Sequence, residues 1–298
     1  MRIVVTGGSG RLGHQVVREL LTHGHTVSSL DTIQPSECLC PTHNVDLRKF
    51  DLLLDYFKNV DSVIHLARIR FPYTETGFNA AKRQWEFKDV GGDAERFNQN
   101  VGVTNNVLAA AQACGVNRIV SGSSLAVYGL YYPVGEVAPD YLPIDELHPR
   151  RPQDPYGLSK LVGEELCEAV ARKSDMQIAT LRFSGIYTEA HGPLLQERQQ
   201  NPTVRGTGAL WSYIDVRDAA RACRLAVEAN FRAHEAVNIC APTTIMDTPT
   251  HELVQRYLSQ VKTVRHGLDG NWCGYAAEKA ATMLGFQARH LFRNGTLQ

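Results

Sequence analysis

Tyr156 and Lys160 stand four positions apart, separated by Gly157-Leu158-Ser159. On a helix this spacing places both side chains on one face, one turn apart. A phenol ordinarily has a pKa of about 10 and is a weak base near neutrality. A nearby ammonium stabilises the phenolate and lowers that pKa, so the pair predicts a general base that takes the proton of a substrate hydroxyl while a hydride leaves. A pair of this kind standing alone is more often an ordinary surface pair.

A glycine-rich turn near the N-terminus supplies a second and independent signal. Arg2-Ile3-Val4-Val5-Thr6 has the composition of a short buried strand, and Gly7, Gly10 and Gly13 follow it at three-residue spacing. Apolar residues then recur at helical spacing from 12 to 21. Glycines let the backbone approach a pyrophosphate closely, and the N-terminus of the helix offers free N–H groups to the phosphates. The order strand, turn and helix therefore predicts a dinucleotide-binding site.

Asp31 ends the next predicted strand, Thr26-Val27-Ser28-Ser29-Leu30. A carboxylate at this place accepts hydrogen bonds from the ribose hydroxyls of the adenosine and repels a 2′-phosphate. The residue therefore favours NAD over NADP. Arg11, in the glycine turn, is a candidate partner for a 2′-phosphate, although a solvated arginine is the better interpretation.

Strand and helix patterns alternate along the chain, as a doubly wound parallel sheet requires. We therefore predict an α/β Rossmann fold with a small C-terminal substrate lobe. The dinucleotide-binding domain is expected at 1–185, with 215–240 returning to it, and the substrate lobe at 186–214 and 241–298. Further strands are predicted at 62–67, 118–121, 177–181 and 236–239, and helices at 50–57, from Pro155 behind an Asp154 cap, and at 215–229.

Composition excludes several classes of function. The chain has 298 residues with 31 basic and 31 acidic side chains and no long basic run, so nucleic acids are poor candidate partners. No apolar run approaches the roughly 20 residues of a membrane span, and we expect a cytosolic protein without a secretory signal. The seven scattered cysteines do not suggest a disulfide framework, and no histidine cluster suggests a metal site. Whether the chain forms a homodimer is left open.

Two further residues fit this chemistry. Ser124 follows the strand predicted at 118–121, so it lies at the carboxyl edge of the sheet, where open α/β folds bind ligands. Its hydroxyl can position the substrate oxygen and stabilise developing charge. Asn100 precedes a long helical stripe. It either relays protons through water to Lys160 or caps that helix, and the sequence favours neither role.

Several short motifs make the chain resemble an extended short-chain dehydrogenase/reductase of the NAD-dependent sugar epimerase/dehydratase family. They are Thr6-Gly7-Gly8-Ser9-Gly10-Arg11-Leu12-Gly13, Val45-Asp46-Leu47, His65-Leu66-Ala67, Asn100-Val101-Gly102-Val103-Thr104, Ser123-Ser124-Leu125-Ala126-Val127-Tyr128-Gly129, Tyr156-Gly157-Leu158-Ser159-Lys160 and Leu181-Arg182-Phe183. The resemblance implies that Ser124, Tyr156 and Lys160 form one catalytic group. Arg11 and Arg68 depart from the family, which more often has an aromatic or aliphatic residue at the first place and a small residue at the second.

The same resemblance implies the course of the cofactor. Asp46 and Leu47 would lie near the adenine, and Leu66 and Ala67 would pass along the dinucleotide. The full set of predicted NAD-binding residues is Gly7, Gly10, Arg11, Leu12, Gly13, Asp31, Asp46, Leu47, Leu66, Ala67, Arg68, Asn100, Tyr156 and Lys160.

The short C-terminal region bears on the substrate. It is small for a lobe that must clamp both a sugar and a nucleotide diphosphate, so it fits a free sugar, uronic acid, lactone or polyol better. Arg205 could bind a carboxylate and Trp211 could stack on a sugar face. The alternatives are a solvated loop arginine and a core tryptophan. In its short lobe the chain is loosely similar to uronate dehydrogenases, which belong to the same superfamily.

Three functions remain open on these grounds. The first is an NAD-dependent dehydrogenase that releases NADH and an oxidised small sugar-like product. The second is an epimerase or dehydratase on a nucleotide sugar, in which NAD is reduced and reoxidised within each turnover. The third is a dinucleotide-binding sensor without catalysis, which the presence of Ser124, Tyr156 and Lys160 disfavours.

Overall fold

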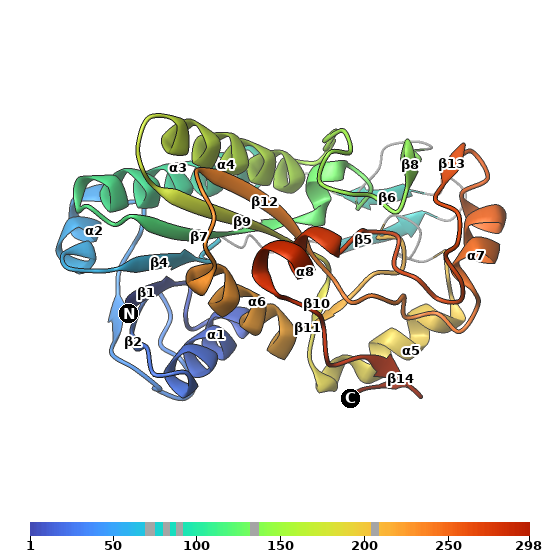
Figure 1. Cartoon of the computed structure of the whole chain (residues 1–298), viewed down its shortest axis with the longest axis horizontal. Helices are drawn as coiled ribbons and strands as arrows, with labels where there is room; N and C mark the ends of the chain where they lie inside the picture. Colours follow the sequence, from blue (N-terminus) through green and yellow to red (C-terminus); the bar gives the residue numbers. More distant parts are fainter. Residues whose placement is uncertain (69–74, 80–83, 88–91, 132–136, 204–208) are drawn as a thin grey trace.

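Seven strands through the centre of the molecule form one parallel sheet (Figure 1). The computed structural model describes residues 1–68, 75–79, 84–87, 92–131, 137–203 and 209–298. The strands follow the order β3-β2-β1-β4-β7-β9-β12, and every neighbouring pair is parallel. They are β1 (Arg2–Thr6), β2 (Thr26–Asp31), β3 (Thr42–Asn44), β4 (Ser62–His65), β7 (Arg118–Ser124), β9 (Gln177–Phe183) and β12 (His234–Ile239). The order is that of a doubly wound sheet, so the predicted fold class is confirmed.

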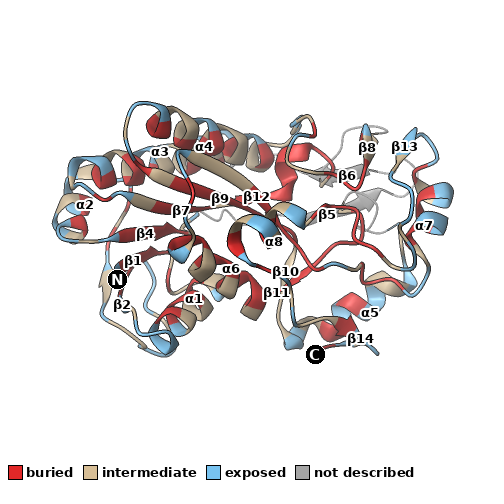
Figure 2. Cartoon of the chain, in the orientation of Figure 1, coloured by how far each residue is buried: buried red, intermediate tan, exposed pale blue. Residues whose placement is uncertain are grey.

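Helices cover both faces of this sheet (Figure 1). Helices α2 (Phe50–Phe57), α3 (Gly92–Ala113) and α4 (Pro155–Arg172) pack together on one face, and α1 (Arg11–Thr22) and α6 (Val216–Glu228) pack together on the other. The central strands β1, β4, β7 and β9 are almost entirely buried (Figure 2). Burial on both faces explains why β1 is an apolar run without alternation.

Alternate residues of β1 contribute to two separate cores. Val4 packs with Leu53 and Val107 beneath α2 and α3. Ile3 and Val5 belong to the core on the opposite face, under α1 and α6. Side chains of a strand alternate between its faces, and here each face meets a layer of helices.

The predicted elements agree with the structure where their sequence pattern is strong. The helix expected at 50–57 is α2, and the helix expected from Pro155 is α4, capped by Asp154. The strand expected at 177–181 continues to Phe183 because its last residues are also buried and paired with β7. Asp215 proves to be the cap of α6 rather than its first residue, since its carboxylate accepts a hydrogen bond from the Arg217 N–H at 2.8 Å.

Short elements escaped prediction. Strand β3 has three residues, and β8 (Tyr141–Leu142), for which no element was predicted, pairs with β13 (Thr263–Val264). Strands β5 (Glu75–Asn79) and β6 (Gln84–Phe87), which were also not predicted, pair antiparallel. Two- and three-residue strands carry too few side chains to show a periodic pattern.

A third hydrophobic core lies beyond the carboxyl edge of the sheet. It includes Tyr128, Trp211, Tyr213, Tyr275 and Phe292, which come from distant parts of the chain. The other described elements are the single turns η1 (Leu125–Tyr128) and η2 (Glu189–His191), β10 (Ile186–Tyr187), α5 (Gly192–Gln200), β11 (Ile214–Asp215), α7 (Thr250–Tyr257), α8 (Glu278–Leu284), β14 (Phe292–Arg293) and β15 (Thr296–Leu297). Of these, α8 packs against α6 and β12 of the main sheet.

The segment 215–240 carries α6 and β12, which belong to the main sheet and its cover. The exact boundaries proposed for the lobe remain a prediction. Within the described part of the chain, no helix combines the length and the apolar character needed to cross a membrane. A cytosolic location and a homodimer likewise stay predictions.

Candidate active site

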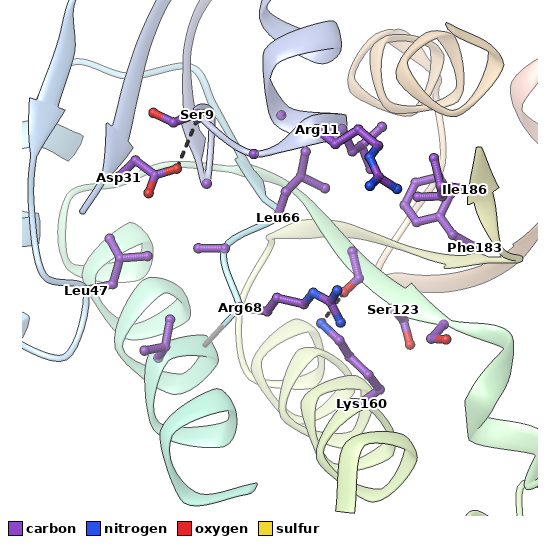
Figure 3. A pocket seen from close by; sticks show the side chains of 18 of the residues that line it. Ser9, Arg11, Asp31, Leu47, Leu66, Arg68, Ser123, Lys160, Phe183 and Ile186 are labelled. Carbon is purple, nitrogen blue, oxygen red and sulfur yellow. Dashed lines mark hydrogen bonds between the residues drawn. The ribbon is translucent and has the colours of Figure 1, made fainter. Parts of the chain in front are cut away.

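A cleft of about 720 Å³ opens at the carboxyl ends of the central strands (Figure 3). It brings together residues that are far apart in the sequence. Among the predicted site residues, it is lined by Gly7, Gly10, Arg11, Leu12, Gly13, Asp31, Asp46, Leu47, Leu66, Ala67, Arg68, Ser124, Tyr156 and Lys160. Ser123, Tyr131, Phe183, Ser184 and Ile186 also line it and were not predicted.

The glycine turn allows an approach that side chains would block. Gly7 has a φ of +77°, and a Cβ on it would lie 2.7 Å from the backbone nitrogen of Ala67. A Cβ on Gly13 would lie 2.1 Å from the carbonyl oxygen of Gly7. Helix α1 can therefore begin directly against the turn, with its N-terminal N–H groups at the cleft. The turn thus fits a pyrophosphate, as predicted from the sequence.

Two carboxylates mark one end of the cleft. Asp31 accepts hydrogen bonds from the backbone N–H groups of Ser9 at 3.0 Å and Ile33 at 3.2 Å, which fix its orientation. Asp46 is bound by the guanidinium of Arg48 at 2.7 Å, and this hydrogen bond lowers the pKa of the carboxyl group. Two negative charges disfavour a 2′-phosphate at this end. Figure 3 shows Arg11 well apart from Asp31, so the arginine does not neutralise it.

Ser124, Tyr156 and Lys160 meet in the cleft from two elements. Ser124 ends β7, and its Oγ accepts a hydrogen bond from the Ala126 N–H at 3.1 Å. That bond uses a lone pair of the hydroxyl and not its proton, so the proton can be donated to a substrate oxygen. Tyr156 and Lys160 occupy successive turns of α4.

A hydrogen bond holds the Lys160 side chain close to the Tyr156 ring. Its ammonium donates a hydrogen bond to the Gly122 carbonyl at 2.8 Å and lies 6.0 Å from the centroid of the Tyr156 ring. Burial lowers the pKa of Lys160, since a low-dielectric environment disfavours the charged form. A phenolate on Tyr156 would offset this effect. The two groups therefore favour each other's charged forms.

Local sequence explains how α4 reaches its place. The Asp154 carboxylate accepts a hydrogen bond from the Gly157 N–H at 2.8 Å, and Pro155 fills the first helical position. A Cβ on Gly157 would lie 2.9 Å from the carbonyl oxygen of Ala126. The first turn of α4 can therefore rest directly on η1, the turn that follows Ser124. This contact brings Tyr156 near the end of β7, where Ser124 lies.

Asn100 is buried behind Lys160 rather than in the main cleft. It lines an adjoining cavity of about 10 Å³, enough for a single water molecule, together with Lys160 and Thr104. This place is compatible with the relay role and does not establish it. Asn100 lies well inside α3, which begins at Gly92, so it does not cap that helix. The capping alternative is therefore wrong.

His65 was not predicted as a functional residue, and the structure gives it a supporting role. Its Nδ1 lies 2.8 Å from the hydroxyl of Thr6, and its Nε2 lies 3.3 Å from the hydroxyl of Thr104. Burial, reinforced by the charge of Lys160, lowers the pKa of His65 to about 3. The ring is therefore uncharged near neutral pH, and it links β1, β4 and α3 through these two contacts.

Arg68 comes closer to the catalytic group than its predicted role implies. Its guanidinium carbon lies 5.5 Å from the centroid of the Tyr156 ring, and its side chain points toward Lys160 (Figure 3). Two cations thus flank one phenol. An arginine at a place where the family more often has a small residue changes the charge of the site and not only its shape.

Of the predicted substrate residues, Ser124 lines the cleft and Trp211 does not. Trp211 is only 2 % exposed, and its indole N–H donates to the Pro202 carbonyl at 2.9 Å. Its ring packs against Tyr257 with centroids 6.2 Å apart. This position favours the core role over sugar stacking. Arg205 lies outside the described residues. Among the residues that are described, no group of three or more His, Cys, Asp or Glu is arranged to hold a metal.

Comparisons with known proteins place this geometry in a family. The sequence model of the NAD dependent epimerase/dehydratase family matches residues 3–240. A protein of Methanocaldococcus jannaschii, provisionally named a UDP-glucose 4-epimerase, is 32 % identical over 80 % of this chain and 76 % of its own length. An L-arabinose 1-dehydrogenase (NAD(P)(+)) of Haloferax volcanii is 28 % identical over 89 % of this chain and 93 % of its own.

A solved structure supports the same family assignment. A short-chain dehydrogenase/reductase superfamily protein of Agrobacterium tumefaciens, crystallised with bound NAD, superposes with a TM-score of 0.70 at 26 % identity, covering 98 % of this chain and 94 % of the other. The chain belongs to the NAD-dependent epimerase/dehydratase family, and its cofactor is NAD.

We expect NAD to bind more tightly than NADP, because Asp31 and Asp46 repel a 2′-phosphate. Asp31→Ala should reduce the ratio of the two affinities by about tenfold, since a hydrogen bond to a charged group contributes about 1.5–3 kcal/mol. Titration of both cofactors measures this. Asp51→Ala, an exposed carboxylate of α2, is the matched control. Equal or tighter binding of NADP by the unmodified protein would contradict the prediction.

Tyr156→Phe should remove most of the turnover while NAD still binds. The change leaves the ring packed and removes the proton acceptor, so the rate should fall by roughly 10²–10⁴. Tyr56→Phe, on α2 and away from the cleft, controls for loss of a phenolic hydroxyl as such. Near-normal turnover of the Tyr156 variant, under conditions where chemistry limits the rate, would show that another group is the base.

Proposed function

We propose that the protein is an NAD-dependent oxidoreductase that oxidises a secondary hydroxyl of a small sugar-like substrate. The observation that carries the proposal is the meeting of Ser124, Tyr156 and Lys160 in the cleft that holds the glycine turn. To oxidise an alcohol, a hydride acceptor must take the hydrogen on carbon while a base takes the proton on oxygen. The glycine turn can hold the acceptor, NAD, in the same cleft as the candidate base, Tyr156.

Each residue then has a defined task. Ser124 donates its hydroxyl proton to the substrate oxygen and fixes its position, and Tyr156 takes the proton from that oxygen. Lys160 stabilises the phenolate that makes this transfer possible. NAD, when bound, accepts the hydride. Leu66, Ala67 and Asp31 line the cleft. Leu66 and Ala67 would lie along the dinucleotide, and Asp31 would bind the ribose of its adenosine.

The small substrate is supported by the extent of one relationship. The arabinose dehydrogenase aligns over 89 % of this chain and 93 % of its own length. A relative of similar extent that is named a dehydrogenase of a pentose supports a free sugar, uronic acid or polyol. Arg205 remains a candidate ligand for a carboxylate.

A second candidate function has its own support. The relative from M. jannaschii is the more similar in sequence and carries the name of an epimerase that acts on a nucleotide sugar. In that reaction the same residues would remove a hydride and return it to the opposite face. An epimerase or dehydratase of this kind therefore differs in the net fate of the cofactor and not in its catalytic group.

Incubation with NAD and a panel of sugars, uronic acids and nucleotide sugars separates the two. Net accumulation of NADH, followed by its absorbance, supports the dehydrogenase. Product without net NADH supports the epimerase or dehydratase. A nucleotide sugar that is turned over efficiently while every free sugar is inert would overturn the small-substrate proposal.

The pair of cations beside Tyr156 favours a substrate with an acidic group. Arg68→Gln should raise KM for an acidic sugar by roughly tenfold and leave the neutral counterpart nearly unchanged, because charge-assisted hydrogen bonds are about twice as strong as neutral ones. Arg172→Gln, an exposed arginine at the end of α4, is the control. Weaker NAD binding by the Arg68 variant with unchanged KM ratios would instead assign the guanidinium to the cofactor.

A further inference from the structure

A buried carboxylate lies one helical turn beyond Lys160. Glu164 is 1 % exposed, and its oxygens accept a hydrogen bond from the Ser123 hydroxyl at 2.7 Å. The guanidinium of Arg182, itself 3 % exposed, binds it through Nε at 3.0 Å and Nη2 at 2.8 Å. Arg150 adds a contact at 3.2 Å. These partners lower the pKa of Glu164 against the effect of burial, so the carboxylate is charged.

Three elements of the active site meet at this carboxylate. Ser123 precedes Ser124 at the end of β7, Arg182 is its direct neighbour in the register of β9, and Glu164 belongs to α4. The bonds therefore fasten the helix that carries Tyr156 and Lys160 to the strand end that carries Ser124. Figure 3 shows Ser123 and Lys160 on the same side of the cleft.

The same bonds extend toward the C-terminal lobe. Arg182 Nη1 donates to the hydroxyl of Tyr128 at 2.8 Å, and that hydroxyl lies 2.8 Å from the side-chain oxygen of Asn238. The side-chain nitrogen of Asn238 donates to the Ile144 carbonyl at 3.2 Å, and its backbone N–H donates to Glu146 at 2.7 Å. Tyr128 and Ile144, which belong to the third hydrophobic core, are thus linked to α4 by hydrogen bonds.

A buried ion pair is a poor means of gaining stability alone. Desolvation of the two charges offsets much of their attraction, and apolar residues of similar volume often stabilise a fold equally well. Hydrogen bonds to a carboxylate fix the orientation of the groups that donate them, whereas apolar contacts do not. The position of Glu164, bonded to Ser123 of β7 and one turn from Lys160 on α4, therefore indicates that its bonds fix how β7 and α4 lie relative to each other.

We propose that Glu164, held by Arg182, is a positioning residue that sets the separation between Ser124 and the Tyr156–Lys160 pair. Glu164 does not line the main cleft and would act through the residues that do. The inference rests on the proposed function only in needing a hydride-transfer turnover as its readout, and either the dehydrogenase or the epimerase reaction supplies one.

Glu164→Gln keeps the shape of the side chain and removes its charge. We expect kcat to fall by about 10- to 100-fold, the loss expected for a displacement of about 1 Å between reacting groups, while KM changes far less. The primary deuterium isotope effect on kcat should rise, because the chemical step becomes rate-limiting. A variant with unchanged kcat and isotope effect would overturn the proposal.

The variant also leaves Arg182 buried without its counter-charge, so the melting temperature should fall. Glu164→Gln combined with Arg182→Gln removes that uncompensated charge and should recover much of the melting temperature. A positioning role keeps kcat low in the double variant. If kcat returns together with stability, the pair is structural only and the proposal is wrong.

Ser123→Ala decides the question if the double variant does not fold. It removes one hydrogen bond to Glu164 and leaves the ion pair, so we expect a smaller loss of kcat with a nearly unchanged melting temperature. Val170→Ala, which loosens the packing of α4 outside these bonds, should lower the melting temperature and leave kcat intact. Normal kcat in Ser123→Ala would contradict the proposal. Absence of turnover in the unmodified protein would count against the proposed function instead.

Discussion

The parallel direction of the strands is the constraint on which the rest of the structure depends. Because all neighbouring pairs in the sheet are parallel, their carboxyl ends open along a single edge. Residues following β1, β2, β4 and β7 must therefore meet there, however far apart they stand in the sequence. The glycine turn, Asp31, Leu66 and Ser124 share one cleft for this reason. Helix α4 adds Tyr156 and Lys160 by packing against the same edge.

Charge is distributed unevenly along the cleft. Asp31 and Asp46 stand at one end, and Lys160 and Arg68 stand beside Tyr156. Under the proposed function each end has a different task, since the first accepts the hydroxyls of a ribose and the second holds a phenolate. Neutral His65 lies behind the second end and adds no charge of its own. The separation of charge would let one cavity serve both tasks.

The sequence allowed the main elements and the glycine turn to be predicted, because glycine spacing, caps and apolar periodicity are local. Other cleft residues, such as Asp46 and Leu66, were predicted only from the resemblance to a known family. The roles of Glu164 and His65 were not accessible in the same way. Both depend on partners from other strands, and only the fold reveals that Arg182 faces Glu164. Trp211 shows the limit clearly, since nothing near it in the sequence indicates that Tyr257 covers its ring. The sequence showed Arg68 as a departure from the family pattern, but it did not show that the guanidinium lies close to Tyr156.

The bonds around Glu164 also have an order in time. Ser124, Tyr156 and Lys160 are all made before residue 161, whereas Asn238 is made long after them. During synthesis a chain can therefore contain every catalytic side chain and still lack β12, the strand beside β9 that carries the last member of the chain of bonds. If the proposed positioning role of Glu164 holds, the growing chain acquires its candidate catalytic side chains first and the residues that align them last.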